Sequence, residues 1–89
     1  MYYTYVLLCQ DMKRLRKKFY IGSTKNLENR IKEHETGEVK TTKNFEIVDL
    51  IYYEASLNKK DARQRELQLK TGFGRGYLNR RLENYLKNS

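Results

Sequence analysis

Two predicted helices carry ionisable side chains on faces that should be apolar. In the first helix, Arg30 and His34 share one stripe with Leu27 and Ile31, because these positions follow the three- and four-residue spacing of a single helix face. In the second helix, Glu66 lies on the inward face. A charge that faces a core is costly unless it is paired or lies at the edge of a cleft, so the pattern indicates a structural ion pair or a functional site.

Two tyrosines favour a functional site over a structural ion pair. Tyr5 and Tyr20 lie on segments that are predicted to pair, and Gly22 follows, where the lack of a side chain lets a backbone or phosphate approach closely. The combined set suits phosphodiester hydrolysis: a carboxylate holds a divalent cation, an arginine neutralises phosphate charge, and a phenol or imidazole handles the proton. A buried salt bridge between Arg30 and Glu66 that only fixes packing is the alternative.

Short strands and helices must position these residues. The pattern of apolar residues predicts three strands, of which the first two form a hairpin, and three helices. The strands are predicted at 2–10, 18–22 and 46–54, and the helices at 26–35, 59–70 and 77–87. The near-continuous apolar run in the third strand predicts that both of its faces are covered. The order β-β-α-β-α-α indicates an α+β fold, a small sheet flanked by helices.

Three connections are predicted from local residue types. Five basic residues between Lys13 and Lys18 favour a mobile cationic finger over a tight turn, with an edge loop kept soluble by lysine as the alternative. Ser23 or Thr24 is expected to cap the first helix. Gly72 is expected to end the second helix, and the glycine-rich segment after it to act as a flexible joint.

Composition and charge narrow the partners. The 89 residues are expected to form one domain over 1–89, and the net charge of +8 favours a polyanion, nucleic acid first. One cysteine and one histidine exclude an internal disulfide and a Cys/His zinc site, and fit a reducing cytoplasm. The longest apolar run near the start is far shorter than the roughly 18 residues of a membrane span, so no membrane partner is expected.

Three segments match one family pattern. The segments YTY at 3–5 and YIG at 20–22 are followed by Arg30, ten residues after the YIG tyrosine, and by the helix ARQRELQLK with Glu66. Over nearly the whole chain the sequence resembles the GIY-YIG nuclease superfamily, although the first motif keeps only the tyrosine of Gly-Ile-Tyr. The tail LKTGFGRGYLNRRL resembles small stand-alone members that are similar to the nuclease domain of the repair excinuclease UvrC.

The resemblance implies a three-stranded antiparallel sheet flanked by helices and a metal-dependent DNA endonuclease. Carried over position by position, Tyr20 or His34 would activate water, and the choice between them stays open. Tyr5 would support the hydrogen-bond network, and Arg30 would grip the scissile phosphate. Glu66 would hold Mg²⁺ or Mn²⁺.

A single ion is expected, because Glu66 is the only carboxylate predicted to face the site, with Glu54 as the one realistic second acid. Asn79 is a candidate for a functional asparagine of the family, and Ser23 stands where the repair branch tends to have lysine. Contacts with DNA are expected from Gly22, Lys17 and Arg75.

DNA repair or recombination is the setting that the resemblance suggests. The oligomeric state and the need for a partner protein that directs the nuclease stay open. A non-catalytic nucleic-acid-binding module that retains the fold is the main rival function, and a structural domain that meets only proteins is the third.

Overall fold

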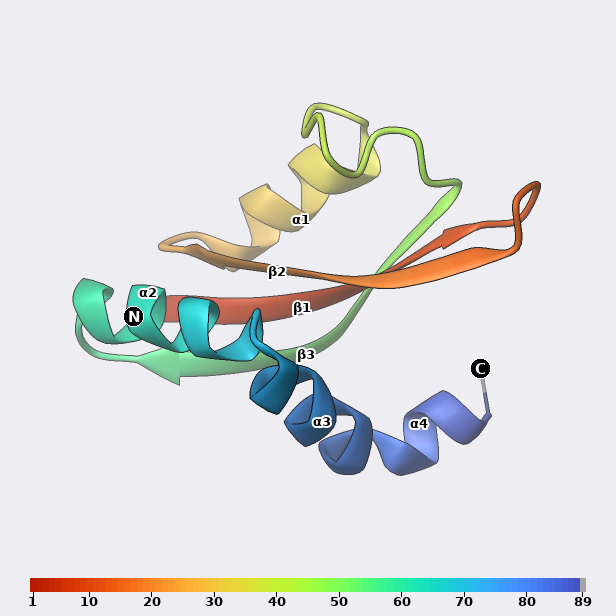
Figure 1. Ribbon diagram of the computed structural model, residues 1–89. Helices are drawn as coiled ribbons and strands as arrows, with labels where there is room; N and C mark the ends of the chain where they lie inside the picture. The colour runs from red at the N-terminus through yellow and green to blue at the C-terminus, as the bar shows by residue number, and fades with distance from the viewer. Residues whose placement is uncertain (89) are drawn as a thin grey trace.

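A three-stranded antiparallel sheet organises the computed structural model, which describes residues 1–88. The order in the sheet is β2-β1-β3, so the first strand of the chain is the central one (Figure 1). The strands are β1 (Tyr2–Asp11), β2 (Arg16–Thr24) and β3 (Ile47–Ser56). The predicted α+β class, the antiparallel three-stranded sheet and the order β-β-α-β-α-α are confirmed, and a short fourth helix at 83–87 takes the last part of the predicted third helix.

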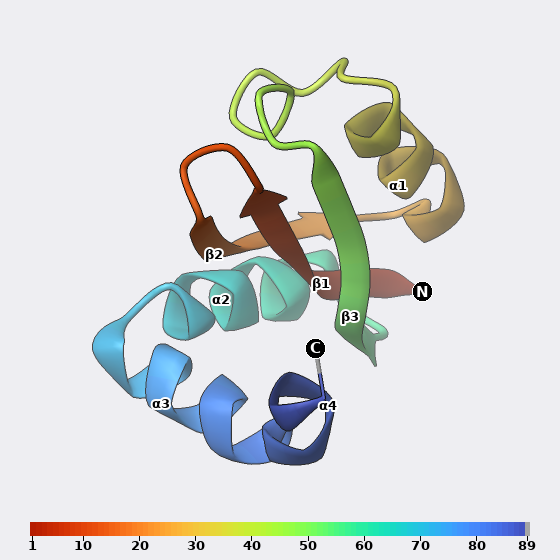
Figure 2. The ribbon, with the colours of Figure 1, turned by 90° about the vertical axis from the view of Figure 1, so that its right-hand side faces the viewer.

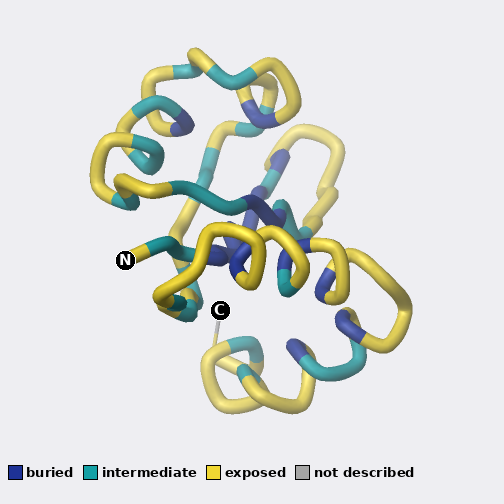
Figure 3. The backbone as a smooth tube through the Cα atoms, turned by 90° about the vertical axis from the view of Figure 1, so that its left-hand side faces the viewer, coloured by how far each residue is buried: buried dark blue, intermediate teal, exposed yellow. Residues whose placement is uncertain are grey.

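The strand covered on both faces is β1. All six residues from Thr4 to Cys9 are buried, as expected for a central strand with helices on either side (Figure 3). The prediction that β3 is covered on both faces was wrong, because β3 is an edge strand with Leu50 and Tyr53 exposed. The exposed Tyr53 ring packs edge-on against Tyr3, at a centroid distance of 6.0 Å. An apolar run alone does not determine whether a strand is central or at the edge of a sheet.

A four-residue loop closes the β1–β2 hairpin, with Asp11 paired opposite Arg16. The Asp11 carboxylate accepts hydrogen bonds from the backbone N–H groups of Lys13 and Arg14, at 3.2 and 3.3 Å. Leu15 has a φ of +54°, the left-handed conformation that short hairpin loops use. The predicted cationic finger was wrong, because three of its five basic residues belong to the paired strand β2.

Helices cover both faces of the sheet (Figures 1 and 2). One face carries α1 (Leu27–Glu35), and the opposite face carries the other three, α2 (Lys59–Leu69), α3 (Gly72–Arg81) and α4 (Glu83–Lys87). In residues 1–88, no helix has the length and apolar character that crossing a bilayer demands.

Alternation along β1 divides the core between the two faces. Towards α2 and α3 the buried cluster is Val6, Ile21, Leu69 and Leu78. Towards α1 the buried cluster is Tyr5, Leu7 and Cys9, with Leu27 and Ile31 packed against it. The predicted inward face of the second helix is confirmed, since Ala62, Glu66 and Leu69 are all buried. Neighbouring residues of one strand therefore meet different helices.

The caps differ from two of the predictions. Asn26, and neither Ser23 nor Thr24, is the N-cap of α1, and its side chain accepts a hydrogen bond from the Asn29 N–H at 3.1 Å. The segment 23–26 contains three residue types that can cap a helix, and the last of them caps α1. Gly72 begins α3 instead of ending α2, with Thr71 as the N-cap.

The glycine-rich segment is part of α3, so the predicted flexible joint was wrong. Gly74 is buried, and a Cβ on it would overlap the Cα and carbonyl oxygen of Leu69 at the end of α2. Glycine is needed at this position because backbone meets backbone. The close approach fixes how α3 leaves α2.

Gly74→Ala is expected to destabilise the fold by about 1–3 kcal/mol, since the backbone of Leu69 has to move. Gly72→Ala is the matched control: nothing lies within 4 Å of its added Cβ, and alanine is the better helix former. Urea unfolding of both variants measures the difference. Equal midpoints would show that α3 tolerates a side chain against α2.

Candidate active site

A chain of hydrogen bonds joins four side chains on the α1 face of the sheet. The Tyr5 hydroxyl lies 3.0 Å from Nε2 of His34, and Nε of Arg30 donates to the same hydroxyl at 3.3 Å. Nδ1 of His34 lies 2.8 Å from the Thr42 hydroxyl. Tyr5, His34 and Thr42 are almost completely buried, whereas the Arg30 side chain is 35% exposed. The guanidinium is therefore the end of the chain that reaches solvent.

The hydrogen-bond partners indicate which atom carries each proton of the network. Thr42 donates its hydroxyl proton to the carbonyl of Val39 at 3.4 Å, so it accepts from Nδ1–H of a neutral His34. Nε2 then accepts the Tyr5 proton, and the Tyr5 oxygen accepts from Arg30. Thr42 holds the imidazole in the tautomer that orients Tyr5.

Burial sets the charge of this network. Burial lowers the pKa of His34 to about 4, and the nearby Arg30 charge contributes in the same direction. Burial raises the pKa of Tyr5 to about 12, against the opposing hydrogen bond from Arg30. Hydrogen bonds to Glu33 and Tyr5 raise the pKa of Arg30. Near neutral pH, His34 and Tyr5 are uncharged and Arg30 carries the positive charge.

Stability should therefore fall as the pH drops through the window between 6.5 and about 4, because the unfolded chain protonates His34 before the folded chain does. At a slope of about 1.4 kcal/mol per pH unit, the loss at about pH 5 is ~2 kcal/mol relative to neutral pH. Since His34 is the only histidine, its NMR resonances report the folded pKa directly. A midpoint near 6.5, or equal pH sensitivity of His34→Gln, would contradict the coupling.

Tyr20 and Gly22 complete the α1 side. The Tyr20 ring packs edge-on against His34, with ring centroids 4.8 Å apart. Gly22 pairs opposite Tyr5, and a Cβ on Gly22 would lie 2.5 Å from the Tyr5 hydroxyl oxygen. The space that glycine provides is thus taken by the phenol of Tyr5, which lies across the edge strand β2.

Glu66 lies on the opposite face of the sheet and is 5% exposed. One carboxylate oxygen accepts the Ser23 hydroxyl at 2.7 Å, and the other contacts Lys70 and Arg63, each at 2.7 Å. Burial alone raises the pKa of Glu66, but the hydrogen bonds from Lys70, Ser23 and Arg63 outweigh it and bring the pKa below its ordinary value. The carboxylate is ionised and held by half-exposed cationic side chains.

The salt bridge considered between Arg30 and Glu66 is not formed. Arg30 pairs with Glu33 on its own helix at 2.9 Å, and Glu66 has the partners described above. Both residues lie on the sheet-facing sides of their helices, as the sequence pattern suggested, but α1 and α2 pack on opposite faces of the sheet. An ion pair between Arg30 and Glu66 therefore does not explain why both residues lie on the sheet-facing sides of their helices.

The two halves meet at consecutive residues of β2. The Tyr5 hydroxyl lies over Gly22 on the α1 face of β2. The side chain of Ser23 points to the opposite face and bonds to Glu66. Because β2 is an edge strand, no further strand of the described residues separates the halves. The negative charge of Glu66 contributes to the raised pKa of Tyr5. The site therefore lies at the edge of the sheet.

Glu54, the predicted second acid, lies outside this arrangement. Nε of Arg65 donates to both Glu54 oxygens, at 3.0 and 3.1 Å, and Tyr52 donates to one of them at 2.8 Å. Glu54 is therefore held by its own partners instead of joining Glu66. Within residues 1–88, no group of three or more acidic, histidine or cysteine side chains is placed to hold a metal ion.

Basic residues line a groove beside the Glu66 side of β2. The groove has a volume of about 690 Å³ and includes both predicted DNA contacts from the basic segments, Lys17 and Arg75. Asn79 and Lys70 also line it. Tyr20 also borders the groove, but its ring packs against His34 on the α1 face.

A comparison with known families decides the classification. The model of the GIY-YIG catalytic domain matches residues 1–81, which include the whole sheet and the helices α1 to α3. The chain belongs to the GIY-YIG family. GIY-YIG proteins form a nuclease superfamily that generally uses divalent metal ions.

Relatives of similar size accompany this GIY-YIG match. A UPF0213 protein of Clostridium perfringens is 41% identical over 71 residues, covering 79% of this chain and 71% of that protein. A UPF0213 protein of Oceanobacillus iheyensis is 36% identical, covering 78% and 76%, and one of Natronomonas pharaonis is 38% identical, covering 79% and 78%. Their names state no activity. No solved structure matches the chain significantly.

The first motif reads Tyr-Thr-Tyr instead of Gly-Ile-Tyr, and the two residues that differ pack within the fold. Thr4 is buried and its hydroxyl donates to the carbonyl of Ala62 in α2 at 2.8 Å, which ties the central strand to that helix. Tyr3 packs against Tyr53. The tyrosine that ends the motif, Tyr5, keeps its place in the central strand.

Sequence reasoning missed three members of the site. Arg63 and Lys70 lie three residues before and four residues after Glu66, a spacing that predicts helical ion pairs and that was readable from the sequence. Thr42 gave no signal, because it lies in a polar loop and meets His34 only through the fold.

Proposed function

We propose that this GIY-YIG domain, taken as residues 1–89, is a divalent-metal-dependent endonuclease that hydrolyses DNA phosphodiester bonds. The observation that carries the proposal is the meeting of two chemically different halves at Gly22 and Ser23. One half ends in the Arg30 guanidinium, and the other is the Glu66 carboxylate. A net charge of +8 suits the phosphate backbone. DNA repair or recombination is the setting we infer.

The residues present fit one hydrated Mg²⁺ or Mn²⁺ at Glu66. Mg²⁺ retains several waters and is commonly bound through one or two carboxylates plus substrate phosphates. The side chains of Lys70 and Arg63 are 48% and 58% exposed, so they have room to release the Glu66 oxygen that they contact. When bound, the ion would polarise the phosphate and neutralise charge that develops on it.

Arg30 is proposed to neutralise the scissile phosphate. It is oriented by Tyr5, and one of its nitrogens pairs with Glu33, whose side chain is 45% exposed. A planar guanidinium suits phosphate because it presents several donors in a fixed fork. The rigid support from Tyr5 and His34 reduces the reorganisation needed as charge develops.

We propose Tyr20 as the group that takes the proton from water. Both nitrogens of His34 are engaged within the fold, and a pKa of about 4 makes the imidazole a weak base. Tyr20 is only partly buried, and its ring lies beside those of His34 and Tyr5. His34 and Thr42 are then positioning residues that hold Tyr5.

A labelled panel of plain, nicked and branched DNA tests this function, with Mg²⁺, Mn²⁺ or EDTA at low salt. Cleavage that depends on the metal is expected for at least one substrate. Salt-sensitive binding that ignores the metal, with no cut in any substrate, would favour the non-catalytic binding module. No binding at low salt would favour a domain that meets only proteins.

A further inference from the structure

We propose that the groove beside β2 binds an unpaired segment of a DNA strand, and that the substrates are junctions between duplex and single-stranded DNA. The proposal names the substrate class of the nuclease function above and rests on it for the position of the cut. Binding by the groove does not depend on cleavage, so the two can fail separately.

The floor of the groove is apolar. Leu8, Phe19 and Ile21 line it from the sheet, and Leu69 lines it from the end of α2. Phe19 packs against the core of this face but is only partly buried. The volume of about 690 Å³ lies within the range of about 300–1,000 Å³ that is usual for small-molecule sites. A flat base fits such a floor.

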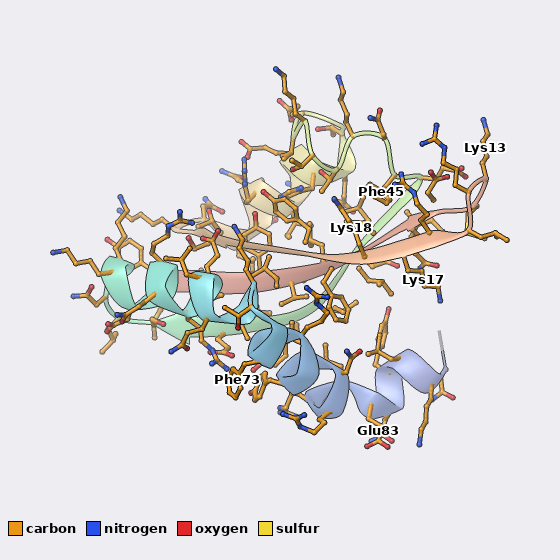
Figure 4. The ribbon with its side chains drawn as sticks, in the orientation of Figure 1. Lys13, Lys17, Lys18, Phe45, Phe73 and Glu83 are labelled. Atoms are coloured by element: carbon orange, nitrogen blue, oxygen red, sulfur yellow. The ribbon has the colours of Figure 1, made fainter. Side chains whose placement is uncertain are left out.

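The rim of the groove is cationic. Lys17, Lys70 and Arg75 line it from β2, from the end of α2 and from α3, and all three residues are exposed. Figure 4 shows Lys17 on the side of β2 that faces α4, whereas Lys18 extends to the other side towards Phe45. Lys18 also borders the groove, but its ammonium lies 5.1 Å from the centre of the Phe45 ring. Lys17 is therefore the strand cation directed to the groove.

An apolar floor inside a cationic rim matches an unpaired strand better than a duplex. A duplex presents phosphates to an approaching surface and keeps its bases stacked and paired, so it makes no use of Phe19. An unpaired strand offers both phosphates for Lys17 and Arg75 and base faces for the apolar floor.

The groove leads to the candidate metal ligand. Lys17, Phe19, Ile21 and Ser23 follow one another on the same face of β2, and Ser23 bonds to Glu66. Lys70 both lines the groove and contacts Glu66. A strand that enters at Lys17 is thus directed along β2 to the carboxylate, which places the cut close to the boundary between paired and unpaired DNA.

Binding in EDTA tests the groove without cleavage. The probes are a fluorescent oligothymidine, a strand of equal length and charge made of abasic residues, and a plain duplex. We expect the oligothymidine to bind at least about fivefold more tightly than the abasic strand, as expected for one base contact. Equal binding of these two strands, or tighter binding of the duplex, would overturn the proposal.

Two charge reversals in the same hairpin locate the binding. Lys17→Glu is expected to weaken oligothymidine binding by more than about tenfold, the size of one lost charge-assisted contact. Lys13→Glu changes the net charge equally but lies in the hairpin loop outside the groove, and a change below about threefold is expected. Equal losses for the two variants would show that only the overall charge matters and would overturn the groove.

The two proposals are distinguished by their readouts. If the groove binds unpaired DNA but no substrate is cut, the nuclease function fails and the groove stands as a binding site. If plain duplex is cut as fast as a duplex with a single-stranded branch, the nuclease function stands and the proposed substrate class fails.

Discussion

Glu66→Gln is expected to lower DNA cleavage by about 10²–10³-fold while DNA binding stays equal or becomes tighter. Glutamine keeps the shape of the side chain and its hydrogen bond with Ser23 but removes the charge that would hold the ion. It also removes a negative charge beside the phosphate path. Cleavage and binding are measured on the substrate that the wild-type protein cuts, with the fold checked by circular dichroism.

Glu83→Gln is the matched control for this change. Glu83 is also a helical acid with a lysine four residues away, but it lies in α4 with its side chain 61% exposed. Its loss should leave cleavage unchanged. If Glu66→Gln cuts as fast as Glu83→Gln, the metal site is elsewhere and the role proposed for Glu66 is wrong.

Arg30→Ala is expected to slow cleavage by about 10²–10³-fold, because a preoriented cation at the phosphate is lost. The stability should change by less than about 1 kcal/mol, since Arg30 pairs with the partly exposed Glu33 and Tyr5 keeps its hydrogen bond with His34. Arg30→Lys should restore only part of the rate, because lysine keeps the charge without the fork of donors.

Lys32→Ala supplies the comparison on the same helix. Lys32 pairs with the exposed Glu28 at 3.7 Å, and its side chain is 67% exposed, so its loss should affect neither stability nor cleavage. Rates and urea midpoints of all three variants are compared. A large loss of stability in Arg30→Ala, with an unchanged rate for the folded protein, would make Arg30 a structural residue.

Helix faces could be predicted because they depend on nearby residues. The spacing of Ala62, Glu66 and Leu69 was enough to identify the buried face of α2, and it did so correctly. Strand order could not be predicted in this way. Whether β1 or β3 is central depends on contacts between distant segments, and both sequences are apolar enough for either position.

The candidate site, too, could be predicted only in part from the sequence. The residue types and their spacing identified Tyr5, Arg30, His34 and Glu66 as unusual, and the fold gathers all four near β2. The sequence did not indicate that Glu66 lies on the other face of the sheet. Nor did it indicate Thr42, which reaches His34 because the loop before β3 folds back over α1.

The short loop of the β1–β2 hairpin has a consequence far along the strand. It sets the register that pairs Tyr5 with Gly22 and Thr4 with Ser23. A slip of one residue would turn Gly22 towards α2 and Ser23 towards α1, which would place a side chain against the Tyr5 phenol and remove the hydroxyl from Glu66. The loop at 12–15 contributes no group to the chemistry, yet a single inserted residue that shifted the register there would reverse both faces of the site.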